Sequence, residues 1–201
     1  MVSARPIKAL LAAAMLLSLP ACGINTIPTA EEEAKARWAD VQNQYQRRAD
    51  LIPNLVESVR GAAAQERNVL REVTEARASA TRIQLSPEQL RDPEAMRAFS
   101  EAQGRLTNAI IPLQRLQEAY PDLKSNQNFL TLQSQLEGTE NRITIARTDY
   151  NRAVQSYNTR IRTFPDVIGA KIFYGAEPMV PFEATTPNAE TAPKVDFGNG
   201  Q

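Results

Sequence analysis

The chain has 201 residues and no histidine, which removes the commonest general base and the commonest metal ligand among the side chains. It has one cysteine, Cys22, so no disulfide can form within the chain and a zinc site built from cysteine and histidine is excluded. The 23 basic side chains are balanced by 23 acidic ones, so a broad electrostatic attraction to nucleic acid or to anionic lipid is not indicated.

Residue groupings typical of catalysis are missing as well. The eight glycines are scattered and form no phosphate-binding loop, and the serines have no histidine base. Three adjacent acids, Glu31, Glu32 and Glu33, are explained by the dipole of a helix that begins just before them. The sequence therefore predicts no catalytic residue, no metal site and no cofactor. A pair of carboxylates facing each other across a bundle stays open as an alternative.

The first 21 residues have the pattern of an export signal. Two basic residues, Arg5 and Lys8, precede an apolar run over residues 9–19, which is shorter than the roughly 20 residues needed to span a bilayer. The run ends in Leu-Pro-Ala-Cys, which resembles a bacterial lipobox and predicts a lipid attached to Cys22. Ordinary cleavage after Ala21 and an uncleaved anchor remain alternatives. We expect residues 22–28 to be a tether.

The rest of the chain is dominated by helical periodicity, and no strand pattern is found. A three-four alternation of apolar residues runs from Trp38 to Ile83 and is broken only by Arg48 and Glu66, which predicts one helix of about 50 residues, or about 75 Å. A second helix begins at Asp92-Pro93, and a third runs from about residue 125 to Pro165. A short helix then ends at Gly175.

These elements predict an all-α fold, an elongated antiparallel bundle of three long helices and a short C-terminal helix with heptad-like seams. The bundle domain is expected to cover residues 29–175. Residues 176–201 hold four prolines and no apolar period, so they are expected to form a disordered tail.

Two prolines fall inside the predicted helices. Pro53 cannot donate a hydrogen bond to the carbonyl of Ala49, and Pro112 has the same effect in the second helix, so both are expected to kink their helices. The amide of Asn54 is a candidate partner for the freed carbonyl. The prolines are either features of shape alone, or a hinge or notch for a partner.

Arg48 occupies a seam position, where a guanidinium must be paired or must reach outward, because an unpaired buried charge costs several kcal/mol. A polar column flanks the apolar stripe of the third helix. The candidate polar network consists of Arg48, Asp50, Asn54, Glu140, Arg147, Asn151 and Asn158. It is interpreted as structural, a pair that fixes helix register, with a ligand or partner site as the alternative.

Three segments together resemble one family. They are NQYQRRADLIPNLVESVRG, the run from AYPDLKSNQ to YNTRIRTFP, and FYG followed by PFEA. In this order they resemble the LemA family of bacterial membrane-associated proteins, over about residues 24–185. The resemblance implies a helical bundle held at a membrane with its body outside the cytoplasm. Family members typically have an N-terminal membrane helix. This chain departs from that pattern with a short apolar run and a lipobox-like end, so we expect a lipid to replace the helix. The resemblance supplies no catalytic residues.

We therefore expect a non-enzymatic scaffold or adaptor for envelope proteins. It is held by an N-terminal lipid on the periplasmic or cell-surface side of a membrane. The expected partner is a protein of the envelope and not nucleic acid, and homo-oligomers are possible through uncovered heptads. The alternative function is an envelope-polymer-binding module or a carboxylate hydrolase.

Overall fold

The computed structural model describes residues 25–61 and 63–183, and this part of the chain is helical without a strand. In chain order the elements are α2 (Thr26–Arg60), α3 (Arg67–Arg82), η2 (Glu88–Arg91), α4 (Pro93–Ala119), α5 (Pro121–Lys124), α6 (Gln127–Arg160), α7 (Asp166–Gly169) and η3 (Ala170–Tyr174). The predicted signal peptide, the lipid site at Cys22 and the tail beyond Glu183 lie outside the described residues.

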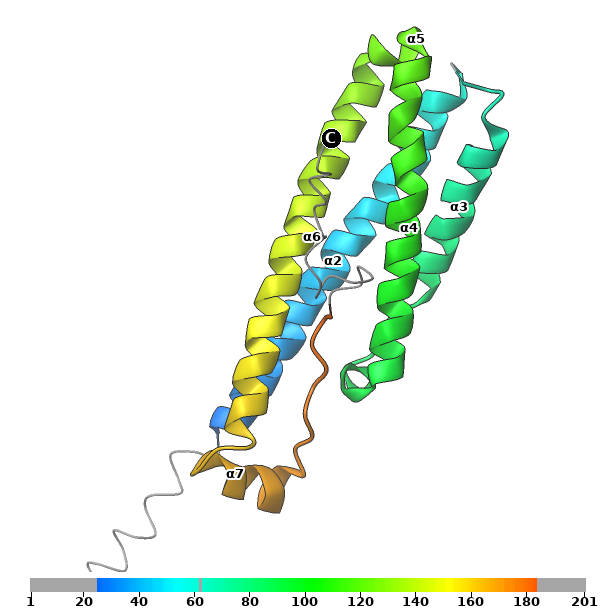
Figure 1. The fold of residues 1–201 in the computed structure, drawn as a ribbon. Helices are drawn as coiled ribbons and strands as arrows, with labels where there is room; N and C mark the ends of the chain where they lie inside the picture. The colour runs from blue at the N-terminus through cyan, green and yellow to red at the C-terminus, as the bar shows by residue number, and fades with distance from the viewer. Residues whose placement is uncertain (1–24, 62, 184–201) are drawn as a thin grey trace, which may run out of the picture.

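The helices form two antiparallel pairs that lie side by side. One pair is α2 and α6, and the other is α3 and α4 (Figure 1). The short helix α5 connects α4 to α6 at one end of the bundle. At the opposite end α7 and η3 lie beside the start of α2, where the Thr26 hydroxyl donates to Asp166 Oδ2 at 3.0 Å.

The prediction of one continuous first helix of about 50 residues is wrong, because the chain reverses after Gly61 and forms two helices. α2 has 35 residues and α3 has 16. The interruption at Glu66 marked the reversal: its carboxylate accepts from the Tyr120 hydroxyl at 3.0 Å, at the end of the bundle. Antiparallel neighbours around one core can continue the same seven-residue spacing, so spacing alone does not separate one long helix from two shorter ones.

Other helix ends follow the predicted capping residues. The Asp92 side chain accepts from the backbone N–H of Glu94 at 2.8 Å and caps α4, whose first residue is Pro93. Gly175 ends η3 with a positive φ of 53°, a conformation that favours glycine. The start of α2 lies earlier than predicted. Thr26 begins the helix and Ile27 is buried, so residues 26–28 are not part of a tether.

Two groups of buried apolar residues fill the bundle. The group towards α5 lies between the four long helices and includes Leu55, Leu106 and Phe129. The group towards α7 includes Trp38 and Tyr150. Along α2, Arg48 falls between the residues of the two groups.

The second group is completed by residues 176–183, here called the C-terminal segment. Its Met179 is 2% exposed and its Phe182 is 6% exposed, so the prediction of a disordered tail is wrong for these residues. They run between α6 and the start of α4, in the space that α3 and α4 leave open beside the ends of α2 and α6 (Figure 1). The prolines of this segment prevent a helix but are compatible with an extended chain. The segment is buried because α2 and α6 extend beyond α3 and α4 at this end of the bundle.

Candidate functional site

The buried guanidinium of Arg48 connects three helices. Its side chain is 1% exposed, and Nη1 donates to Thr107 Oγ1 and to Glu140 Oε1, both at 2.9 Å. Nη2 donates to the carbonyl oxygen of Gln103 at 3.1 Å and to its Oε1 at 2.7 Å. Since Arg48 lies on α2, Glu140 on α6 and the other two on α4, the cluster of Arg48, Gln103, Thr107 and Glu140 joins these three helices through the hydrogen bonds of one buried guanidinium.

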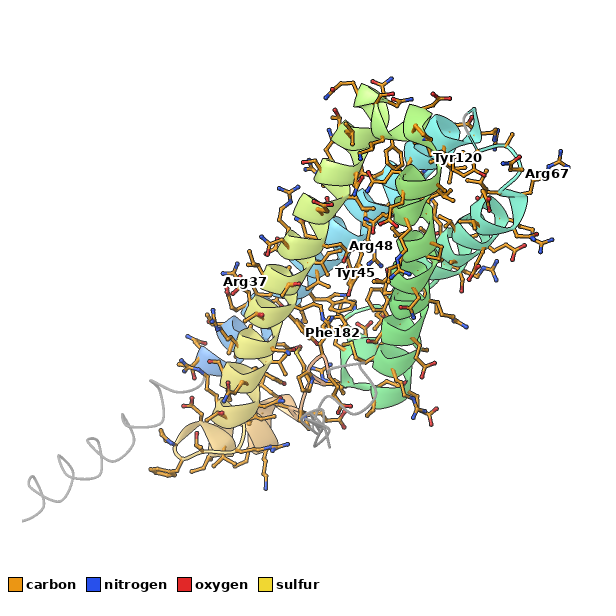
Figure 2. All side chains as sticks on the ribbon, turned by 45° about the horizontal axis from the view of Figure 1, so that its top comes forward. Arg37, Tyr45, Arg48, Arg67, Tyr120 and Phe182 are labelled. Carbon is orange, nitrogen blue, oxygen red and sulfur yellow. The ribbon has the colours of Figure 1, made fainter. Side chains whose placement is uncertain are left out.

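The same cluster reaches α3 through Gln103. The side-chain amide of Gln103 donates to the carbonyl oxygen of Ala80 at 3.1 Å, in the last turn of α3 where carbonyls lack a partner within the helix. Arg48 also lies over the ring of Tyr45, with 5.0 Å from its Cζ to the ring centroid. Burial raises the pKa of Tyr45, so its phenol stays neutral beside this charge. Figure 2 shows Tyr45, Arg48 and Phe182 together in the interior of the bundle.

Two asparagines of α6 hold the backbone of the C-terminal segment. Asn151 donates to the carbonyl oxygen of Phe182 at 3.0 Å and accepts from its N–H at 2.8 Å. Asn158 makes the same pair with Met179, at 2.8 and 2.9 Å. Each asparagine therefore satisfies both polar backbone groups of one residue, as a neighbouring strand would.

Two tyrosines repeat the arrangement. Tyr150 donates to the carbonyl oxygen of Val180 at 2.9 Å, and Tyr157 donates to that of Glu177 at 3.1 Å. Burial raises the pKa of Tyr150, so its hydroxyl remains a donor. A step of seven residues along α6 thus matches a step of three along the segment, because seven helical residues rise about 10.5 Å and three extended residues span about 10 Å.

Apolar contacts add a side-chain preference to the groove along α6 in which the C-terminal segment lies. The ring of Phe182 stacks on Trp38 at 5.6 Å between centroids, and its edge contacts Tyr150 at 5.8 Å. The guanidinium of Arg147 covers the other side of Phe182 at 4.8 Å, and it also donates to the carbonyl oxygen of Glu183 at 3.1 Å. The groove therefore binds an extended chain by its backbone, with Met179 and Phe182 as the two buried side chains.

The prolines of the segment occupy positions where no N–H is required. The backbone N–H groups of Met179 and Phe182 bind asparagines, and that of Val180 donates to the carbonyl oxygen of Leu90 at 2.8 Å. Pro178 comes directly before these donors and Pro181 lies between two of them. At both positions the lack of an N–H costs nothing and the fixed φ favours an extended chain.

A comparison with protein families decides the affiliation of the chain. The family model described as "LemA family" matches residues 37–197, which include all of α3 to η3 and the C-terminal segment. The chain belongs to the LemA family. Its curated relatives include magnetosome protein MamQ 2 and magnetosome protein MamQ 1 of Paramagnetospirillum magneticum, each 28% identical over 157 residues. Magnetosome protein MamQ of Magnetospirillum gryphiswaldense is 27% identical. The alignments cover 70% of this chain and 58% of each relative, so the chain spans little more than half the length of these relatives.

In this LemA-family chain the predicted polar network is divided between two places. Arg48 and Glu140 meet in the buried cluster, whereas Arg147, Asn151 and Asn158 hold the C-terminal segment. The other two predicted members, Asp50 and Asn54, are exposed on the outer side of α2, where Asp50 accepts from Gln46 at 2.7 Å.

The carbonyl freed by Pro53 has a partner that the sequence did not indicate. The Nε of Arg77, on α3, donates to the carbonyl oxygen of Ala49 at 2.7 Å. Asn54, the predicted candidate, lies in the helix that contains the proline, and the actual donor crosses from the neighbouring helix. Pro53 and Pro112 both lie in helices and are exposed.

Several residues of the site escaped the sequence interpretation. Gln103 lies on α4 in the same three-four spacing as Phe99 and Leu106, so a polar residue in the seam was visible in the sequence there, as it was at Arg48. Thr107 lies beside this stripe, and nothing in its spacing distinguishes it from a surface residue. Tyr150 and Tyr157 fall on the apolar stripe of the third helix, so their spacing alone predicts core residues and not hydrogen-bond donors. A signal was present, because the pair Tyr-Asn occurs at 150–151 and again at 157–158, and a heptad repeat of two hydrogen-bonding side chains indicates a periodic polar partner.

A polar groove of about 620 Å³ lies between α2, α4 and α6, and it shares Arg147 with the site of the C-terminal segment. Arg48 and Tyr45 contribute to it, with Glu101 and Asn108 from α4 and Glu140 from α6. The described residues contain no group of three or more acidic or thiol side chains placed to hold a metal ion. None of the helices in the described part of the chain is both long enough and apolar enough to cross a membrane.

Proposed function

We propose that this protein is a membrane-attached, extracytoplasmic scaffold or adaptor that holds an extended segment of an envelope protein in the groove of α6. The observation that carries the proposal is the arrangement of Tyr150, Asn151, Tyr157 and Asn158, which hold a chain by its backbone. Recognition of this kind gives affinity through the main chain and specificity through a few side-chain pockets. The chain's own C-terminal segment fills the groove within one molecule.

The partner segment is expected to resemble the segment that it replaces. It needs two apolar side chains three residues apart, at the positions of Met179 and Phe182. It tolerates proline at the positions of Pro178 and Pro181, since the groove uses no N–H there. An acidic residue after the second anchor suits the half-buried guanidinium of Arg147.

A binding experiment with a peptide tests this groove. In a variant with Met179→Ser and Phe182→Ser, the C-terminal segment loses its anchors and the groove opens. A fluorescent peptide with the sequence AEPMVPFE should then bind, and a control peptide AEPSVPSE should not. Adding Asn158→Leu should weaken peptide binding by about 5- to 150-fold, because it removes two hydrogen bonds at about 0.5–1.5 kcal/mol each. If the opened variant keeps its helical circular dichroism but binds neither peptide, the groove is not a peptide site.

Membrane attachment is tested separately. The intact mass of protein extracted from membranes should correspond to a chain that begins at an acylated Cys22, and Cys22→Ser should release the protein or leave it unprocessed. Unmodified cysteine at the N-terminus, or retention of Met1, would rule out the lipid.

Binding of an envelope polymer is the second candidate, and one observation favours it. The groove beside the Arg48 cluster is polar and open, and hydroxyl-rich polymers bind such surfaces through arginine, asparagine and carboxylate groups. The Glu140 carboxylate is already engaged by Arg48 at 2.9 Å, which favours binding over hydrolysis. Asn108→Ala should weaken sedimentation with envelope glycan if this candidate is right, and should leave AEPMVPFE binding unchanged.

A further inference from the structure

The end of the molecule at α7 and η3 has an unusual distribution of apolar side chains. The exposed large apolar residues there are Phe164 (80%), Ile168 (45%), Ile172 (70%), Phe173 (66%) and Tyr174 (43%). Of the eight exposed large apolar residues among those described, five lie within these eleven positions. Isolated exposed apolar residues need no explanation, but a contiguous group of this size marks an interaction surface. We call these five residues the α7–η3 surface.

The side of this element that faces the bundle is formed by small residues. Gly169 and Ala170 are buried, and Ala170 belongs to the core around Trp38. A helix on the surface of a soluble domain normally buries its large apolar residues and exposes its polar ones. Here the small residues pack inward and the isoleucines and phenylalanines point outward, so packing of the bundle does not account for them.

The place of this surface relates it to the start of the described chain. Thr26 and Asp166 are hydrogen-bonded, so α7 lies beside the first turn of α2. Cys22 precedes Asn25 by three residues, and three residues span at most about 11 Å. An attachment point at Cys22 therefore brings this end of the bundle, and not the α5 end, to the lipid.

The composition of the surface matches the boundary between headgroups and acyl chains. Aromatic residues are favoured there, and lysine and arginine beside them extend to the phosphates. Arg162 and Lys171 are exposed at either side of α7. The nearest acid, Asp166, is engaged by Thr26 at 3.0 Å and by Arg160 at 3.7 Å.

The geometry points to a lipid-contact site: the α7–η3 surface inserts into the leaflet to which the chain is attached, and so holds the bundle upright on the bilayer. The inference rests on the membrane attachment proposed above. An anchor at a single point leaves a domain free to tilt, whereas a second contact with the bilayer fixes its orientation. The occupant is lipid because apolar aromatic area and cations lie together at the attachment end.

Fluorescence of the full chain reconstituted in vesicles tests the site. Phe173→Trp adds a reporter to the exposed surface, and Leu130→Trp is the matched control, since Leu130 is also exposed and lies about 45 Å away along α6. The vesicles contain phosphatidylcholine and phosphatidylglycerol, with or without bromine on the acyl chains. The added emission of Phe173→Trp should shift to the blue and be quenched at least about twofold more by brominated lipid than that of Leu130→Trp. Circular dichroism checks that both variants are folded.

The outcomes separate this inference from the proposed function. If the protein floats with vesicles but both tryptophans respond alike to bromine, attachment stands and the lipid-contact site is wrong. If the protein does not float, attachment and the lipid-contact site both fail. A blue shift of Phe173→Trp that increases with protein concentration and is insensitive to bromine would assign the surface to a second copy and overturn the inference.

Discussion

Replacement of Arg48 by methionine measures what the buried cluster contributes to stability. Methionine keeps most of the packing of the stem and removes the guanidinium. Gln103 is 6% exposed and its Oε1 loses a charged donor, which costs about 1–3 kcal/mol for a buried acceptor left without a partner. Glu140 also loses its partner, but its side chain is 40% exposed, so water replaces the guanidinium at a cost of about 1 kcal/mol or less.

The expected total is a decrease of about 1–4 kcal/mol in the free energy of unfolding. For a domain of this size, that corresponds to a melting temperature lower by roughly 2–16 °C. Urea unfolding followed by circular dichroism gives the free energy, and two double-mutant cycles apportion it. The coupling of Arg48→Met with Gln103→Met should exceed its coupling with Glu140→Gln, because Gln103 is the partner without access to water. A larger coupling with Glu140 would refute this reasoning, and so would a single variant as stable as the wild type.

Three further changes test other contacts. Phe182→Ala should lower the free energy of unfolding by about 3–5 kcal/mol unless the C-terminal segment detaches first, whereas Pro181→Ala, at an exposed position of the same segment, should change it little in thermal melts. Arg77→Met should lower the free energy of unfolding of the wild type by about 1–3 kcal/mol, because the carbonyl oxygen of Ala49 loses its donor. The effect should be smaller in a Pro53→Ala background, where a backbone N–H can bind the same carbonyl. Equal effects in both backgrounds would contradict this reasoning. Burial alone would raise the pKa of Glu31, but its lysine and arginine neighbours hold the pKa below the ordinary 4.5, so the stability that Glu31 adds is present above that pH and lost as pH falls below it. The melting temperatures of the wild type and Glu31→Gln should therefore converge in acid.

Several helix boundaries could be predicted because they are set by local chemistry. Asp92 followed by proline, Pro121 and Gly175 each determine a backbone geometry that does not depend on distant residues. The reversal at Gly61 could not be distinguished from a continuous helix, because it depends on how the apolar stripes of different helices pack against one another. The heptad spacing on the two sides of the turn is the same.

The candidate site was only partly visible for a related reason. A column of polar residues on α6 follows from the spacing of Glu140, Asn151 and Asn158, and the structure places them along one side of the helix. The nature of the partner does not follow from spacing, since a helix and an extended chain can both occupy that side. Met179 and Phe182 are buried only because α2 and α6 extend beyond α4, and that overhang depends on the lengths of all four helices.

The match between seven helical residues and three extended ones has a limit that bears on the size of any bound chain. The two repeats differ by about 0.5 Å in each period, from about 10.5 Å on the helix and about 10 Å on the chain. Hydrogen-bond distances vary by about 0.5 Å around their optimum, so two consecutive Tyr-Asn pairs fit without distortion and a third or fourth would drift out of phase. The repeat of the helix therefore matches the repeat of an extended chain at two consecutive Tyr-Asn pairs and not over a longer stretch. A straight segment longer than about seven residues would have to curve around α6 to keep its contacts, and a short one gains nothing from further repeats.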